Sequence, residues 1–391
     1  MIEVTNSAAN NAKMPLISVI GIGGGGNNAV DRMLAAGLEN VNFISINTDD
    51  QVLERCCAPQ KLQIGKKLTG GLGAGADPSV GEASAEEAAE EIANTVAGSK
   101  MAILTCGLGG GTGTGAIPVV ARICREQKVL TVAVVTLPFS FEGLPKHELA
   151  MKGLEALRTN IDMLLIIPND KLLQVNEKNF YLEDAFIMAD NVLKDTIQGI
   201  TDIIYGTGII NLDYNDIQTT LGNKGLGHLG IGTVKSDESI LDAVKQAINS
   251  PLLDTDISSA TNILLNTSGR INLASLDEAV SYIREITNPA VKILWGTVNN
   301  RNSADEITVT LIATGLSDTE PKQKTQTTSE YCITEKPENH SNTVEEATEH
   351  RIAINSKADN DMILHIPIFL QKYSTLRKAD NQNQKQGLLR H

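Results

Sequence analysis

Short β-branched runs alternate with segments of helical periodicity along the first 180 residues, and this alternation most restricts the possible folds. The runs LISVIGI and NFISIN flank the helical segment NNAVDRMLAAGL, and MAILTC and VLTVAVVTL flank AIPVVARICREQ. These strands read as near-continuous apolar runs, so both of their faces are expected to be buried. The sequence therefore predicts an α/β fold with a Rossmann-like parallel sheet covered by helices on both faces.

The rest of the chain predicts a long central helix, a second and smaller α/β domain, and a tail. One helix is also expected in the segment GEASAEEAAEEIANTVAG, and another over residues 181–204. After Ser317 the composition becomes polar, which is typical of disorder. The predicted parts are a flexible N-terminus (1–15), a nucleotide-binding domain (16–180), a central helix with an acidic loop (181–222), a C-terminal α/β domain (223–316), a disordered linker (317–361), a partner-binding peptide (362–373) and a variable end (374–391).

Composition argues against several classes of function. The 391-residue chain has a formal net charge of −14 and only 3% aromatic residues, which disfavours nucleic-acid binding. None of its five cysteines forms a CxxC pair, so no metal site is expected. No run approaches the roughly 20 apolar residues of a membrane span, so direct membrane insertion is not expected and a cytoplasmic protein is predicted.

Three glycine-rich segments follow or adjoin predicted strands. They read GIGGGGNNAV from Gly21, GLGAGADP at 71–78 and GLGGGTGTGA at 107–116. Without bulky side chains, backbone N–H groups can approach phosphate oxygens, the helix N-termini favour anions, and Thr112 and Thr114 add hydroxyl donors. Three such segments predict that the protein binds a ligand with one long phosphate chain, although the lysine-containing P-loop string is absent.

The first glycine segment alone also fits a dinucleotide site. It satisfies G-x-G-x-x-G through Gly21, Gly23 and Gly26, and Asp49 lies in the region of the ribose-binding acid of such folds. An NAD-binding oxidoreductase therefore stays open as an alternative.

The string GGGTGTG looks like the signature of the tubulin and FtsZ superfamily. From about Leu16 onward the chain resembles the FtsZ family of bacterial cell-division GTPases. The supporting strings, in order, are GGGGNNAV, INTDDQ, GLGAGADP, PFSFEG, IPNDKLL, ADNVL, GIINLDYNDI and SPLL.

This resemblance implies a site for GTP or GDP, with Mg²⁺ bound mainly through the nucleotide. A carboxylate can accept both N1–H and N2–H of guanine, so Asp190 would select GTP. The implied contacts are Gly24, Gly25, Gly26, Asn27, Asn28, Gly109, Gly110, Gly111, Thr112, Gly113, Thr114 and Gly115; Ala74, Gly75 and Ala76 at the γ-phosphate; Glu142 at the ribose; Lys146 near the phosphates; and Asn169, Phe186 and Asp190 around guanine.

The resemblance assigns catalysis to an acidic loop containing Asn211, Asp213 and Asp216. Paired carboxylates can orient and polarise water at a γ-phosphate, directly or through Mg²⁺. Asp213 follows Asp190 by 23 residues, and a continuous helix would separate them by about 30 Å. We therefore expect the loop to act on a neighbouring subunit in a head-to-tail homopolymer, so that assembly activates hydrolysis. By the resemblance, these filaments form the ring at the division site beneath the inner membrane.

The apolar string ILHIPIFLQK resembles the peptide with which this family recruits membrane tethers and regulatory division proteins. Several residues differ from the usual family pattern: Gly70, Asp77, Leu144, Pro145 and Lys146 around the site, and His365 and Gln371 in the tail. A GTP-binding scaffold without hydrolysis is a further alternative.

Overall fold

The computed structural model describes residues 17–38, 40–174, 181–205, 213–250, 255–269, 271–298 and 306–316. The predicted N-terminal segment, linker and partner-binding peptide lie outside these residues, as does Asn211 of the acidic loop.

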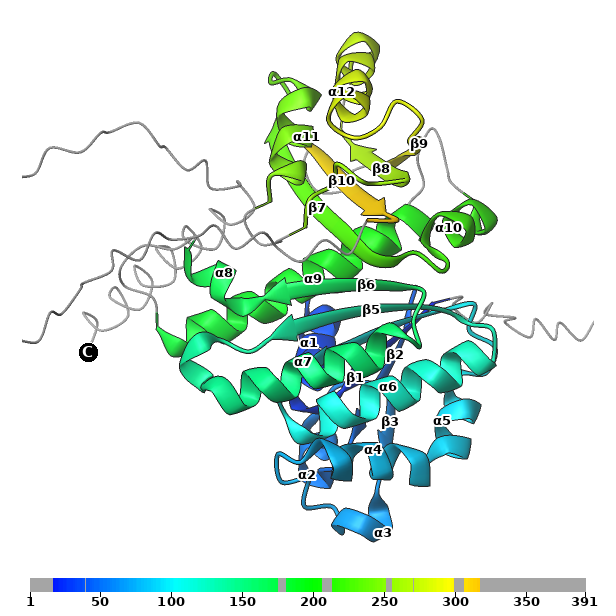
Figure 1. Ribbon diagram of the computed structural model, residues 1–391, viewed down its shortest axis with the longest axis vertical. Helices are drawn as coiled ribbons and strands as arrows, with labels where there is room; N and C mark the ends of the chain where they lie inside the picture. The colour runs from blue at the N-terminus through cyan, green and yellow to red at the C-terminus, as the bar shows by residue number, and fades with distance from the viewer. Residues whose placement is uncertain are drawn as a thin grey trace, which may run out of the picture. The chain divides into compact units, whose positions relative to one another are not determined.

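Six parallel strands form the first part of the sheet, in the order β3-β2-β1-β4-β5-β6 (Figure 1). Their bounds are Ile17–Ile22 (β1), Asn42–Asn47 (β2), Gln60–Gln63 (β3), Met101–Gly107 (β4), Leu130–Leu137 (β5) and Met163–Pro168 (β6). Every residue of β1 is buried, as a strand covered on both faces requires. The predicted parallel-sheet fold is confirmed.

Helices cover both faces of this sheet. Ile20, Leu104 and Val135 pack into one core with α4, α5, α6 and α7, while α1 and α9 contact each other and adjoin strands of the sheet. The helix bounds are Gly23–Ala35 (α1), Asp50–Arg55 (α2), Lys66–Thr69 (α3), Pro78–Glu87 (α4), Ala89–Val96 (α5), Gly111–Glu126 (α6), Leu144–Arg158 (α7), Asn169–Gln174 (α8) and Leu182–Tyr205 (α9), with a 3-10 turn at Ser140–Glu142.

The prediction of a single helix in the segment at 81–98 is wrong, because the helix is broken at Ala88. Ala88 has φ −101° and ψ 16°, and it separates α4 from α5. The break lets each half bury its own apolar residues: α4 packs on α6, and α5 places Ile92 and Val96 fully inside the core. Helical periodicity alone cannot show such a change of direction.

A second group of strands continues the sheet in the order β7-β10-β8-β9, as the predicted smaller α/β part requires. β7 pairs in parallel with β6 and antiparallel with β10, β10 is antiparallel to β8, and β8 is parallel to β9. The group has its own hydrophobic core. The bounds are Tyr214–Leu221 (α10), Gly225–Lys235 (β7), Ile240–Ile248 (α11), Asn262–Ser268 (β8), Leu273–Ile286 (α12), Lys292–Val298 (β9) and Glu306–Thr314 (β10).

The direction of the parallel strands gives the sheet two chemically different edges. The carboxyl ends of β1 and β4 run into α1 and α6 through glycines, whereas the amino ends of β4, β5 and β6 lie at the opposite edge. No helix in the part of the chain that the structure describes is long and apolar enough to cross a bilayer.

Candidate functional site

Two of the glycine segments meet at the carboxyl ends of the adjacent strands β1 and β4. Gly23 has φ +71°, and a Cβ atom at this position would lie 2.8 Å from the main-chain nitrogen of Gly113. Only glycine allows both this backbone conformation and this close approach. The N-termini of α1 and α6 are thereby brought together, which favours an anion at this edge.

The remaining glycine segment, at 71–78, packs on the start of α6. A Cβ atom at Gly111 would lie 2.8 Å from the Asp77 main-chain nitrogen and 3.0 Å from the Ala74 Cβ. The same loop is joined to the start of α2, because the Asp50 N–H donates to the Gly71 carbonyl at 3.2 Å. The three segments that are separate in sequence therefore form one surface, on which Gly75 and Ala76 are exposed.

Some of the predicted contact residues have structural partners instead of open surface. The Asn27 side chain is fully buried, donates to the Gly21 carbonyl at 2.9 Å and accepts from Asn47 Nδ2 at 2.7 Å. The buried Thr114 hydroxyl accepts the Gly109 N–H at 2.9 Å. These side chains hold the glycine loops in shape, so their contribution to a ligand site is indirect.

A recess of about 180 Å³ opens beside the glycine loops. Eight of the predicted contacts line it: Gly25, Gly109, Gly110, Glu142, Lys146, Asn169, Phe186 and Asp190. The other twelve do not: Gly24, Gly26, Asn27, Asn28, Ala74, Gly75, Ala76, Gly111, Thr112, Gly113, Thr114 and Gly115. Gly107 and Leu108 of the glycine segment at 107–116 also line it, although they were not among the implied contacts. The sequence did not identify four further lining residues: Thr136, Pro138, Ala189 and Leu193. The recess draws together residues from opposite ends of the predicted nucleotide-binding domain.

One wall of the recess is polar. Glu142 accepts the Phe139 N–H through Oε1 at 2.9 Å and Lys146 Nζ through Oε2 at 2.9 Å. Glu142 is therefore held in one orientation, with a side chain only 15% exposed, whereas the Lys146 side chain is 49% exposed. A positive group at the mouth of the recess and a fixed acceptor behind it suit a ligand that carries both anionic and hydroxyl groups.

Phe186 contributes an aromatic ring to the lining of the recess. Phe186 is 42% exposed and meets Phe139 edge-on at 5.4 Å between ring centroids, and Phe139 stacks on Phe141 at 4.9 Å. An exposed ring supported from behind can receive a flat heterocycle.

The deep end of the recess presents hydrogen-bond acceptors. The Asn169 side chain is 5% exposed, and its Oδ1 has no hydrogen-bond partner. The Asp190 carboxylate accepts from Arg32 Nε at 2.8 Å through Oδ2. Burial raises the pKa of Asp190, and the hydrogen bond and charge of Arg32 act in the opposite direction. A buried amide oxygen without a donor and a carboxylate oxygen outside the Arg32 pair fit a base that has N–H donors.

Arg32 and Thr48 are two residues that the sequence did not single out. Arg32 lies one helical turn after Asn28 on α1, a spacing that could have indicated its side of the helix. The Thr48 hydroxyl lies 2.7 Å from the Thr112 hydroxyl, which joins the end of β2 to the start of α6. Asp49 caps α2 by accepting the Val52 N–H at 3.1 Å.

The acidic residues are placed at the other edge of the sheet. Asp213 caps α10 by accepting the Asp216 N–H at 2.8 Å, and neither residue lines the recess. The adjacent Tyr214 donates its hydroxyl to the carbonyl of Lys100, the residue before β4, whereas Gly107 ends this strand at the recess. Seven residues of strand span about 20 Å. The glycine loops and the acidic residues of one chain are therefore separated by the length of β4.

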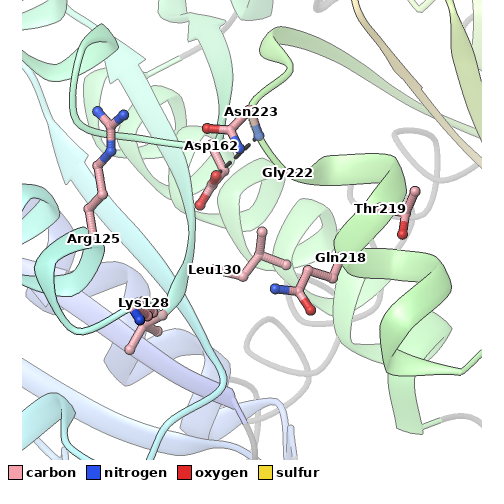
Figure 2. A pocket seen from close by; sticks show the side chains of 9 residues that line it. Arg125, Lys128, Leu130, Asp162, Gln218, Thr219, Gly222 and Asn223 are labelled. Carbon is pink, nitrogen blue, oxygen red and sulfur yellow. Dashed lines mark hydrogen bonds between the residues drawn. The ribbon is translucent and has the colours of Figure 1, made fainter.

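A larger cavity of about 440 Å³ lies at this amino edge, and Figure 2 shows its lining. Arg125, Lys128, Asp162, Gln218 and Asn223 line it, and none of them is a predicted site residue. Within the described ranges, no three His, Cys, Asp or Glu side chains converge as a metal site.

Two family models match the chain. Residues 16–177 match the GTPase domain of the Tubulin/FtsZ family, and residues 225–317 match the C-terminal domain of the FtsZ family. A solved FtsZ dimer of M. jannaschii is 44% identical, with a TM-score of 0.72 over 76% of this chain and 88% of that one. A GTPγS-bound CetZ2 protofilament of Haloferax volcanii has a TM-score of 0.67 over 78% of this chain and 94% of that one; at 19% identity it shows the fold alone.

Proposed function

The chain belongs to the FtsZ family of tubulin-like cytoskeletal cell-division GTPases, and from this membership we propose that it polymerises head to tail into filaments of a contractile ring at the bacterial division site. Family membership implies that it binds GTP and GDP, hydrolyses GTP and associates with itself. The assignment of residues, the activation by assembly and the ring are our proposals.

The guanine base of GTP would occupy the deep end of the recess. Asp190 would accept N1–H and N2–H, which adenine does not offer in this arrangement, and Phe186 would stack on the ring. Asn169 Oδ1, buried without a partner, supports this placement because it needs a donor. Glu142 would bind the ribose, and Lys146 would lie near the phosphates.

The phosphates would extend over the joined glycine segments towards Ala74, Gly75 and Ala76. Backbone N–H groups and the dipoles of α1 and α6 would bind them. Because this cradle has few cations, Mg²⁺ bound mainly by the phosphates would supply the remaining positive charge.

The separation of Asp213 and Asp216 from the recess is the observation that carries the mechanism. Two carboxylates at the amino edge cannot reach a nucleotide bound at the carboxyl edge of the same sheet. In a head-to-tail filament, however, they would meet the γ-phosphate of the next subunit, where they would orient the attacking water. Asn211 would belong to the same loop. Hydrolysis would then require contact between subunits.

The concentration dependence of hydrolysis tests this proposal. Phosphate release per molecule should rise steeply with protein concentration, together with light scattering. Asp213→Ala should still bind GTP and assemble while releasing little phosphate, and Asp237→Ala, an exposed carboxylate after β7, is the control. A rate per molecule that stays constant down to dilute monomers would refute the shared site.

The same experiment addresses the alternatives. An NAD-binding oxidoreductase would bind nicotinamide cofactor without preferring GTP, and the use of the Asp49 carboxylate as the cap of α2 speaks against its role at a ribose. A scaffold without hydrolysis would assemble without releasing phosphate.

The C-terminal peptide at 362–373 would recruit membrane-tethering and regulatory division proteins, placing the filaments beneath the inner membrane. Deleting residues 362–391 should remove tether binding and leave GTPase activity intact, which a binding assay with and without these residues would show.

A further inference from the structure

One carboxylate joins three separate segments at the amino edge of the sheet. Asp162, immediately before β6, accepts the Thr131 N–H through Oδ2 at 2.8 Å and the Asn223 N–H through Oδ1 at 3.1 Å. Its main-chain oxygen accepts from Lys224 at 2.8 Å and Gly225 at 3.0 Å, and its own N–H donates to Thr131 at 2.9 Å. Figure 2 shows Asp162 facing the turn at Asn223. The hydrogen bonds of Asp162 thus link the turn between α10 and β7 to the starts of β5 and β6.

The N-terminal end of α10 also contacts the amino edge of the sheet. Tyr214, its first residue, donates its hydroxyl to the Lys100 carbonyl at 2.6 Å, and the Lys100 ammonium lies 5.5 Å from the ring centroid. Burial and then the charge of Asp162 raise the pKa of Tyr214 to about 12, so the hydroxyl stays protonated and remains a donor at neutral pH. Tyr214 lies next to Asp213 in the chain and close to Asp162 in space.

These contacts matter because α10 has only eight residues. A helix of this length is marginal without tertiary contacts, so its position depends on what holds it. Asn223 has φ +53°, a backbone conformation that favours glycine, and the bond from its N–H to Asp162 helps to hold it there. The orientation of the Asp213 cap therefore depends on contacts at both ends of the helix.

We propose that Asp162 and Tyr214 are positioning residues for GTP hydrolysis, which hold α10 so that Asp213 and Asp216 meet the nucleotide of the neighbouring subunit. The inference rests on the proposed shared site and adds residues to it. Neither residue lines the recess at the carboxyl edge, so they would affect turnover and leave nucleotide affinity unchanged.

Two substitutions test this role with little change of shape. Tyr214→Phe removes the hydroxyl donor and keeps the ring beside Lys100. Asp162→Asn replaces one acceptor oxygen by an NH₂ group that faces a backbone N–H. Tyr282→Phe is the matched control, because Lys245 lies 5.5 Å from the Tyr282 ring in the same way but the pair is on α11 and α12. We expect kcat to fall about fivefold for Tyr214→Phe and more than about tenfold for Asp162→Asn, with GTP affinity within about twofold of the wild type and melting temperature followed in parallel.

A mixing experiment separates positioning from general damage. Asp190→Ala should lose the base contact and retain an intact acidic loop, whereas Asp162→Asn should bind GTP and offer a misplaced loop. In mixed filaments, the loop of an Asp190→Ala subunit should act on GTP held by an Asp162→Asn subunit. Hydrolysis by the mixture should therefore exceed the sum of the two variants measured alone.

The outcomes distinguish this inference from the shared site itself. If Asp162→Asn and Tyr214→Phe hydrolyse GTP at the wild-type rate while Asp213→Ala does not, the positioning role is wrong and the shared site stands. A loss of GTP affinity in step with kcat would also overturn positioning, because it indicates general structural damage. If both variants are slow but mixing restores nothing, the shared site fails, and the inference fails with it.

Discussion

Replacing Arg32 by alanine should weaken GTP binding although Arg32 does not line the recess. In the structure its Nε donates to the Asp190 carboxylate at 2.8 Å, and the Asp190 side chain is 14% exposed. Without Arg32 the carboxylate remains buried and loses its charged donor. The carboxylate would then be held less firmly in the orientation that guanine requires.

The size of the effect follows from the contact. A hydrogen bond to a charged group contributes about 1.5–3 kcal/mol when both partners are buried. Arg32 is 37% exposed, so solvent screening places the expected loss near the lower end, about 1.5 kcal/mol or roughly tenfold in Kd. The Kd of Arg32→Lys for GTP should lie between those of the wild type and Arg32→Ala, because an ammonium keeps the charge but lacks the planar guanidinium geometry.

The loss of GTP affinity in Arg32→Ala should also depend on pH. Arg32 lowers the pKa of Asp190 against the effect of burial, so its removal raises that pKa further. A higher pKa leaves less carboxylate ionised at a given pH, and only the ionised form can accept both guanine N–H groups. The affinity of Arg32→Ala for GTP should therefore fall more steeply than that of the wild type as pH decreases from 8 to 6.

Calorimetric titration of nucleotide-free protein with GTP at pH 6, 7 and 8 measures both effects. Arg122→Ala is the control, because Arg122 has similar exposure and pairs with Glu86 away from the recess. Unchanged affinity in Arg32→Ala, or a loss that is the same at every pH, would refute the role of Arg32 in holding Asp190.

Three further predictions concern stability and loop geometry. Gly26→Ala should lower the free energy of unfolding by about 1–3 kcal/mol, because its Cβ would collide with the Thr105 carbonyl oxygen of β4 and main-chain atoms of Gly21 in β1, whereas Gly24→Ala meets nothing within 4 Å; thermal melting of the two variants compares them. Thr114→Val should weaken GTP binding several-fold, because it leaves the Gly109 N–H without its acceptor, whereas Thr114→Ser should bind as the wild type does in the same titration. Burial raises the pKa of Asp202 from 3.8 to about 6, so its contribution to stability is fully present below pH 3.8 and is lost as pH rises through 6; Asp202→Asn should therefore be more stable than the wild type at pH 7.5, by up to about 3 kcal/mol, with little difference at about pH 3, as urea unfolding followed by circular dichroism would show.

Local sequence patterns predicted the elements that span many residues. The β-branched runs at β1, β4 and β5 and the long periodic helix α9 lie where the sequence places them. The break at Ala88 and the short helices α2, α3, α8 and α10 were not predicted. A segment of a few residues is too short to show a clear hydrophobic periodicity, and tertiary contacts determine whether it is helical.

At the site, the composition indicated the glycine loops but not which glycines pack against the chain itself and which line the recess. A glycine string shows that backbone must come close to something, yet Gly23 approaches Gly113 of the same protein, while Gly25 and Gly109 line the recess. Likewise, nothing in the sequence near Asp190 indicates Arg32, which lies 158 residues away.

The sequence by itself determined the class of fold and the family, and it predicted the edge of the sheet at which phosphates would bind, because strand patterns, glycine runs and motif order are local properties of the chain. Only the tertiary structure decided which side chains are already committed to other partners, such as Asn27 and Thr114, and which stay open to a ligand, such as Asn169 Oδ1. Burial and hydrogen bonding depend on segments that are distant in the chain. The same reason explains why Asp162 shows no signal in the sequence and nevertheless joins three elements in the fold.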